Sequence, residues 1–263
     1  MGNKDNAFKR LIGDKEMFLR FLRKFMLGIV PEKVAEMLRS GEFSPDNLIL
    51  ENTTFIPADL REKQSDAVWR ISMGDLEAYV YILIEHQSTV DFLMPFRLLN
   101  YMTQLWLRCV TRSGQASRRK DFKLPPVVPV VFYEGERRWS ADIRFSDKIY
   151  GAENFRRYIP EFEYKLISLR DDPAVELSSR PDALEILLYL STPFKGEGLL
   201  EVSEKIRSFL QIIPDKEKEL LARHLGGYLK ILASGEGIAL DNESEDIFEE
   251  KEAEPMLTYI EKE

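Results

Sequence analysis

The first forty residues repeat apolar side chains at helical spacing. Between residues 5 and 39 these side chains recur three and four positions apart, and a second amphipathic run extends from Pro31 to Leu38. This spacing gathers apolar side chains on one face of a helix. The chain is therefore expected to open with helices.

Three later segments have the composition of strands. They are TTFIPAD (53–59), SDAVWRIS (65–72) and LEAYVYILIE (76–85). The last two flank Met73-Gly74-Asp75, a turn signal that predicts a β-hairpin. The run AYVYILI is apolar at every position, which is typical of an interior strand covered on both faces.

The remainder of the chain alternates between the two patterns. Helical spacing returns at 92–111, a basic loop follows at 113–123, and the stretch PPVVPVVFYEGE (125–136) predicts a second buried strand in which Pro129 indicates a bulge or an edge register. FEYKLISL (162–169) is also extended. Further helices are expected at about 181–191, 198–212 and 215–234.

This order of elements describes a small α/β core with later helices packed on it. Residues 1–235 are expected to form one domain with a helical C-terminal part, and 236–263 an acidic linker or tail. That tail holds 11 acidic residues against Lys251 and Lys262, so of the formal net charge of -8 it carries -9 and leaves the body near +1.

A nearly neutral body removes the objection that an acidic protein cannot bind nucleic acid. Basic residues gather at Lys9 to Lys24 and at Arg112 to Lys123. Such patches suit a phosphate surface, although solvated helix and loop surfaces would have the same composition. The tail could serve a protein partner or homo-oligomer.

The cellular setting follows from cysteine content and hydropathy. Cys109 is the only cysteine, which excludes a disulfide framework or a cysteine-rich zinc site and fits a reducing cytosol. No stretch reaches the roughly 18 apolar residues of a membrane span. A cytoplasmic protein without membrane contact is expected.

The predicted hairpin carries the candidate chemistry. Asp66 opens its first strand and Glu85 closes the second, so both carboxylates belong to the same end. Antiparallel neighbours lie about 5 Å apart, close enough to share one hard cation such as Mg²⁺. Gln87, two residues after Glu85, falls on the same side, with His86 opposite. Register decides whether Asp66 shares that side, and a solvated strand end is the alternative.

Several blocks together resemble a known family. FKRL (8–11), SDAVWR (65–70), IEHQS (84–88), FRLLNYM (96–102) and PPVVPVVFYEG (125–135) resemble the recombination-promoting nucleases (Rpn), also called YhgA-like putative transposases, of the PD-(D/E)XK nuclease superfamily. The resemblance runs from about Asn6 to at least Tyr189. It implies a restriction-endonuclease-like core of order αβββαβ, a mixed sheet flanked by helices, with additional C-terminal helices.

The resemblance also implies an activity and a site. Asp66, Glu85 and Gln87 match the catalytic positions, with Asp66 and Glu85 as ligands of Mg²⁺ or Mn²⁺. Most of the superfamily has lysine at the position of Gln87. The resembled family has glutamine there, as this chain does. The implied function is a metal-dependent DNA endonuclease linked to recombination or mobile DNA. The alternative is a weak or inactive nuclease-fold module that binds DNA or protein.

Other residues have two readings each. Lys9, Arg97 and Tyr101 are candidates for contacting DNA or for positioning the site, but Lys9 also fits an exposed helix face, and Arg97 with Tyr101 fits a structural stack one helical turn apart. His86 is expected to pack and His224 to lie on the surface. The tryptophans are expected in the core or at its edge, namely Trp69, Trp106 and Trp139.

Overall fold

The computed structural model describes residues 3–51, 67–73, 76–172, 178–191 and 199–235. Two compact units divide the chain: a helical unit of residues 1–39 and 169–263, and a sheet unit of residues 40–168. The mixed α/β class expected from the sequence is confirmed. Within the described residues, no helix combines the length and the apolar character needed to cross a bilayer.

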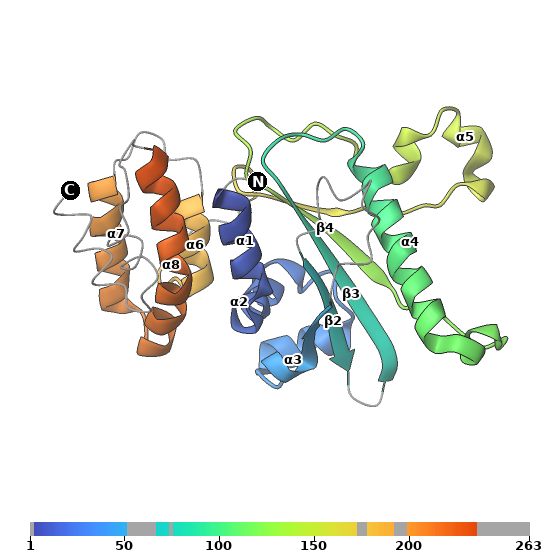
Figure 1. The fold of residues 1–263 in the computed structure, drawn as a ribbon, viewed down its shortest axis with the longest axis horizontal. Helices are drawn as coiled ribbons and strands as arrows, with labels where there is room; N and C mark the ends of the chain where they lie inside the picture. Colours follow the sequence, from blue (N-terminus) through green and yellow to red (C-terminus); the bar gives the residue numbers. More distant parts are fainter. Residues whose placement is uncertain (1–2, 52–66, 74–75, 173–177, 192–198, 236–263) are drawn as a thin grey trace. The chain divides into compact units, whose positions relative to one another are not determined.

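The sheet unit contains five strands in the order β1-β2-β3-β4-β5. They are β1 (Leu48–Leu50), β2 (Ala67–Met73), β3 (Leu76–Gln87), β4 (Val127–Tyr133) and β5 (Lys165–Ser168). The first three pair antiparallel, whereas β3 with β4 and β4 with β5 pair parallel. Met73 pairs with Leu76, which confirms the hairpin. Because β3 has a strand on each side, its predicted interior position is confirmed (Figure 1).

The predictions for TTFIPAD and for Pro129 have separate outcomes. The segment TTFIPAD lies outside the described residues, and β1 precedes it, after a turn at Pro45–Asn47 that Ser44 caps. No register shift interrupts the β3–β4 pairing at Pro129, so of the two alternatives expected there the bulge is absent and the edge register is confirmed. β5 pairs with β4 only from Val130 onward. Pro129 therefore has a strand on one side only, which is where a missing N–H is tolerated.

One long helix, α4 (Met94–Ser113), connects the parallel strands β3 and β4 and confirms the predicted helix. Parallel neighbours need such a crossover. The helix lies along the sheet (Figure 1), and its apolar face packs there in one buried cluster. The cluster joins Met94, Leu98, Tyr101, Met102 and Leu105 of α4 to Val68, Val127, Val131 and Tyr133 of the sheet and to Trp139, Ala141 and Tyr164 after β4.

Short elements follow α4 and β4. A 3₁₀ turn, η4 (Gly114–Arg118), lies in the predicted basic loop. Between β4 and β5 the chain forms η5 (Phe145–Lys148), α5 (Ala152–Phe155) and η6 (Arg156–Tyr158). No periodic pattern announces these three, because each is about one turn long. This part of the chain carries large exposed side chains.

The helical unit combines the two ends of the chain. Its N-terminal part is α1 (Asn3–Gly13), α2 (Lys15–Phe21), a π-helical turn (Leu22–Met26) and α3 (Glu32–Ser40), and its C-terminal part is α6 (Ala183–Ser191), α7 (Leu199–Ile212) and α8 (Asp215–Gly235). These helices confirm the sequence-based prediction. α1 packs against α8, and α2 against α6. Segments about 200 residues apart therefore form one bundle.

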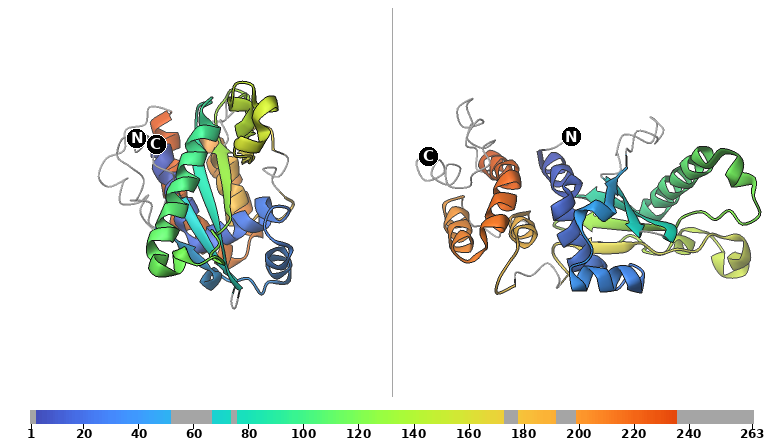
Figure 2. Two further views of the ribbon diagram at one scale, coloured as in Figure 1. Left: turned by 90° about the vertical axis from the view of Figure 1, so that its right-hand side faces the viewer. Right: turned by 90° about the horizontal axis from the view of Figure 1, so that it is seen from below.

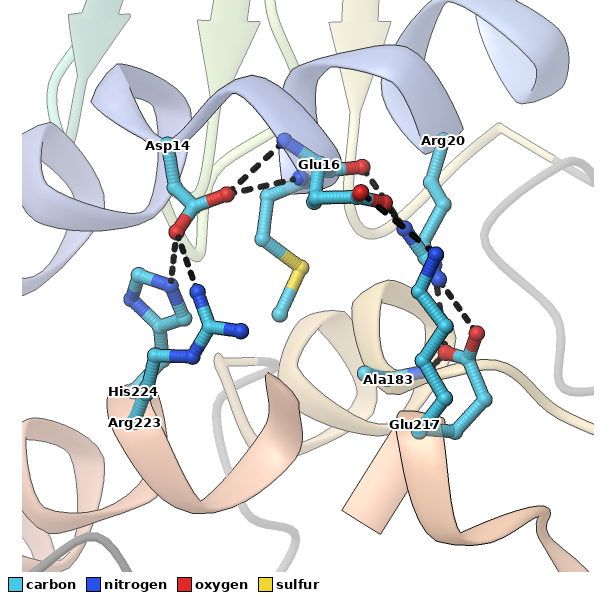
Figure 3. Close-up of polar contacts among 9 residues, drawn as sticks. Asp14, Glu16, Arg20, Ala183, Glu217, Arg223 and His224 are labelled. Carbon is cyan, nitrogen blue, oxygen red and sulfur yellow. Dashed lines mark hydrogen bonds and ion pairs between the residues drawn. The ribbon is translucent and has the colours of Figure 1, made fainter. Parts of the chain in front are cut away.

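Ion pairs inside this bundle change the picture of the N-terminal basic patch (Figure 3). The Arg20 side chain, only 10% exposed, pairs with Glu16 and Glu217, and Glu217 also accepts a hydrogen bond from the Ala183 backbone at 3.0 Å. Lys24 pairs with Glu185 at 2.5 Å. Two of the cations counted from the sequence thus have partly buried carboxylate partners.

His224 is not a surface residue, contrary to expectation. Its side chain is 8% exposed, and its Nε2 lies 3.4 Å from Asp14 Oδ2 (Figure 3). Asp14 also caps α2 by accepting from the backbone N–H groups of Glu16 and Met17. Burial raises the pKa of Asp14, but the contacts with His224 and these N–H groups outweigh it and lower the pKa to about 2.

Asp14→Ala is expected to lower the free energy of unfolding at neutral pH by about 1–2 kcal/mol, because α2 loses its cap and His224 loses its partner. Asp14→Ser is the matched control, since serine caps equally well but carries no charge. The ionic contribution is present above the ordinary pKa of 3.8 and disappears as the pH falls toward 2. Urea unfolding between pH 7 and 2 measures it. A constant difference between wild type and Asp14→Ser would contradict the assignment.

Candidate functional site

The candidate site lies where β2 begins and β3 ends. Ala67, which directly follows Asp66 in the sequence, pairs with Ile84, which directly precedes Glu85. Asp66 itself lies outside the described residues. The register therefore sets the chain positions adjacent to the two carboxylates opposite each other, at one end of the hairpin.

The β3–β4 register identifies the face. Glu85 is the partner of Val131 and Gln87 the partner of Tyr133, and both partners belong to the buried cluster beneath α4. Paired residues of neighbouring strands share a face. The register positions of Glu85 and Gln87 are thus on the α4 side, and that of His86, opposite Phe132, is on the other. Gln87 is 5% exposed, so its amide is buried.

The end of β3 is held in place by the chain that follows β4. The Glu134 N–H donates to the Gln87 carbonyl at 3.0 Å, one step beyond the last β4 residue. The Tyr133 hydroxyl donates to the Arg137 carbonyl at 2.6 Å. At Gly135, a Cβ would lie 2.5 Å from the Ser88 carbonyl oxygen and 2.3 Å from the Tyr133 hydroxyl. Only glycine permits this approach.

Gly135→Ala is therefore expected to lower the free energy of unfolding by about 1–3 kcal/mol, the usual range for overpacking. A backbone carbonyl cannot move aside as a flexible side chain can. Gly28→Ala is the control, because a Cβ there meets nothing within 4 Å. Urea unfolding compares the two. Equal stability of both variants would mean that the contact at Gly135 relaxes freely.

Arg97 and Tyr101 lie together on α4. Arg97 donates from Nη1 to Asp91 at 2.6 Å and from Nη2 to the Tyr101 hydroxyl at 3.3 Å, with its guanidinium 5.9 Å from the Tyr101 ring centroid. Tyr101 is 2% exposed. Its burial argues against contact with DNA, and its contact with Arg97 confirms the structural stack that was the second expectation. Lys9 lies on α1 of the helical unit.

A hydrogen-bonded pair of aromatic residues lies within the same cluster. Trp139 Nε1 donates to the Tyr164 hydroxyl at 2.9 Å, which in turn donates to the Asp142 carbonyl at 2.9 Å. Burial raises the pKa of Tyr164, so the hydroxyl stays protonated and serves as a structural donor. The expected packing of the tryptophans is confirmed: Trp69 and Trp139 are buried, and Trp106 packs at the edge of the cluster.

Sequence reasoning missed a buried carboxylate at the edge of the sheet. Glu51 follows β1, and its side chain is 7% exposed. It pairs with Arg70 of β2 at 2.9 Å and with Arg108 and Arg112 of α4, each at 3.3 Å. Glu51 therefore ties α4 to the sheet. The spacing of Arg108 and Arg112, one helical turn apart, was the available signal, but nothing local pointed to Glu51.

No group of three potential metal ligands among His, Cys, Asp and Glu occurs within the residues that the structure describes. Asp66 and the Glu85 side chain fall outside that set. The expected pair of metal ligands therefore stays a prediction.

Comparison with known proteins identifies a matching family and several relatives. The family model described as putative transposase, YhgA-like, matches residues 3–221. Recombination-promoting nuclease RpnD of Escherichia coli O157:H7 is 34% identical over 117 residues, covering 41% of this chain and 43% of that protein. Recombination-promoting nuclease RpnC of Escherichia coli K12 is 31% identical over 144 residues, covering 54% and 46%.

A third relative has a different name. The inactive recombination-promoting nuclease-like protein RpnE of Escherichia coli K12 is 39% identical over 90 residues, covering 34% of this chain and 27% of that protein. The chain thus spans less than half the length of each of these three relatives. No solved structure matches it.

Proposed function

Because this chain belongs to the YhgA-like putative transposase family, we propose that it is a Mg²⁺-dependent DNA endonuclease acting in recombination or on mobile DNA. Asp66, Glu85 and Gln87 form its site. The observation that carries the proposal is the pairing of Ala67 with Ile84, which brings the positions next to both carboxylates to one end of the hairpin. The names of RpnD and RpnC support a nuclease role.

The order of elements supports a restriction-endonuclease-like core within this proposal. An antiparallel meander of β1, β2 and β3 is followed by α4 and then by β4, parallel to β3. With a preceding helix, this is the αβββαβ order that the family resemblance implies. The proposed PD-(D/E)XK assignment thus rests on topology together with the positions of Asp66, Glu85 and Gln87.

The proposed chemistry assigns each residue one task. Asp66 and Glu85 would bind the metal through carboxylate oxygens, the ligands that Mg²⁺ prefers. When bound, Mg²⁺ or Mn²⁺ polarises a phosphoryl oxygen and lowers the pKa of a water. Gln87 orients the attacking water through its amide. Burial of Gln87 and the Glu134 hydrogen bond to its carbonyl hold that strand end in place.

Nicking of supercoiled plasmid tests this function. The purified protein should convert supercoiled DNA to open circles in Mg²⁺ or Mn²⁺, and the conversion should stop in EDTA. Equal nicking with and without EDTA would indicate another activity, and no nicking with either metal would contradict the proposal.

Gln87→Ala is expected to slow nicking by about 10²-fold or more, the cost of losing one positioned polar group. Gln87→Lys should retain or raise the rate, because an ammonium adds charge stabilisation in the transition state. Initial nicking rates at saturating Mg²⁺ measure both. Unchanged activity in Gln87→Ala would reduce this residue to part of the buried strand end.

The alternative function is a weak or inactive nuclease-fold module that binds DNA or protein. The name of RpnE favours it, since that relative is called inactive. Gln87 is also a poorer electrostatic catalyst than lysine. The acidic segment 236–263, proposed to bind a protein partner or a second copy, lies outside the described residues. DNA binding without nicking in the plasmid assay would support this alternative.

A further inference from the structure

The chain between β4 and β5 forms an arm, residues 144–163, with a well-defined base. Arg144 and Glu163 form an isolated antiparallel bridge, and the Phe145 N–H donates to the Phe162 carbonyl at 3.1 Å. The rings of Phe145 and Phe162 stack with centroids 5.6 Å apart. The arm therefore projects from a fixed closure and belongs to the sheet unit, as the candidate site does.

Large aromatic side chains lie exposed on the arm. Tyr150 is fully exposed, Tyr158 is 84% exposed and Phe155 56%. One exposed ring is ordinary, but three within nine residues of the chain favour a binding role. η5, at the start of the arm, packs beside α4, as Figure 1 and the left view of Figure 2 show.

Charge on the arm separates into an acidic base, whose two cations are paired with carboxylates, and a basic tip. At the base, Arg144 pairs with Glu161 and Glu163, and Lys148 pairs with Asp142 at 2.7 Å. At the tip, Arg156 and Arg157 are exposed and lie between Phe155 and Tyr158 in the chain. From residue 149 to 158 the only acidic residue is Glu153. The exposed rings are thus accompanied by a net positive charge.

We propose that the arm binds single-stranded DNA, with bases stacking on Tyr150, Phe155 and Tyr158 and phosphates pairing with Arg156 and Arg157. This inference rests on the proposed function and specifies its substrate as DNA with unpaired bases. Aromatic rings beside cations are the chemistry of single-strand binding, since a ring stacks on any base and a guanidinium neutralises phosphate. In duplex DNA the bases already stack on each other, so the rings have no free base face to contact.

Fluorescence anisotropy in EDTA measures binding without cleavage. A labelled 20-nucleotide oligothymidine and a 20-base-pair duplex serve as probes. The double variant Tyr150→Ala/Tyr158→Ala should bind the single strand at least about tenfold more weakly, because two stacking platforms for bases are lost, with much less effect on the duplex. Tyr150→Phe/Tyr158→Phe should bind like wild type. Both rings are so exposed that folding should be unaffected, which thermal unfolding checks.

The arginines have a separate readout. Arg156→Gln/Arg157→Gln should reduce the slope of log affinity against log salt for the single strand by about 1.4, or about 0.7 per phosphate. Lys33→Gln/Arg180→Gln, two exposed cations of the helical unit that lie outside both basic patches, is the matched control. If both charge variants weaken binding equally and the alanine variant has no effect, general electrostatics explains the binding and the proposal is overturned. Equal losses for duplex and single strand in the alanine variant would also overturn it.

The nicking assay separates this inference from the proposed function. If the protein nicks DNA but the tyrosine-to-alanine variant binds single strands normally, the nuclease proposal stands. The proposal that the arm binds single-stranded DNA is then overturned. If the protein never nicks DNA but binds the single strand through these rings, the single-strand-binding proposal is supported and the nuclease proposal is contradicted. A change in sedimentation of the tyrosine-to-alanine variant without DNA would instead assign the rings to contact with a second copy.

Discussion

Asp66→Ala and Glu85→Ala are each expected to abolish metal-dependent nicking while leaving the protein folded. Each removes one of two carboxylates proposed to bind the metal, and a single remaining ligand should not retain it. Little stability should be lost, because removing one of two like charges relieves repulsion. Plasmid nicking over a Mg²⁺ titration measures activity, and circular dichroism with urea unfolding measures the fold.

Glu219→Ala provides the control, since Glu219 is an exposed carboxylate on α8 of the helical unit. It should nick at the wild-type rate. Wild-type nicking by Asp66→Ala or Glu85→Ala would show that the site is elsewhere. Partial activity restored by higher Mg²⁺ would support weakened metal binding, because a lost ligand first lowers affinity.

Glu51→Ala is expected to lower the free energy of unfolding by about 3 kcal/mol, near the lower end of the range for breaking a buried ion pair. It removes the shared partner of Arg70, Arg108 and Arg112, whose side chains are 22%, 21% and 56% exposed. Water that reaches these arginines offsets part of the loss. Urea unfolding at neutral pH measures the effect.

Two further variants separate charge from packing at Glu51. Glu51→Gln preserves the volume but removes the charge, so it should be nearly as destabilising as alanine. Arg112→Ala should cost under about 1 kcal/mol, because this guanidinium is mostly exposed. If Glu51→Ala is no worse than Arg112→Ala, the three contacts do not hold α4 to the sheet. A drop in nicking with Glu51→Ala would link that attachment to the site.

The sequence by itself determined the elements and their local order. Helical spacing predicted α4 and the helices of both chain ends, the Gly74-Asp75 turn predicted the hairpin, and the apolar run AYVYILI predicted an interior strand. These signals are local: backbone geometry repeats over a few residues, so the pattern of side chains reports it directly. The short helices of the arm carried no such period.

Only the tertiary structure decided which side chains meet. Arg20 and its partner Glu217 are 197 residues apart in the chain, and Asp14 and its partner Arg223 are 209 apart. The sequence of a charged helix is the same whether its charges face water or pair with a distant segment. His224 was for this reason wrongly placed on the surface. The same holds for Glu51, for the contact that requires glycine at 135, and for the register that assigns Gln87 to the α4 face. Strand register and helix packing join segments that are distant in the sequence. A local pattern indicates which face of a helix or strand is buried, but it does not specify which residues that face will contact.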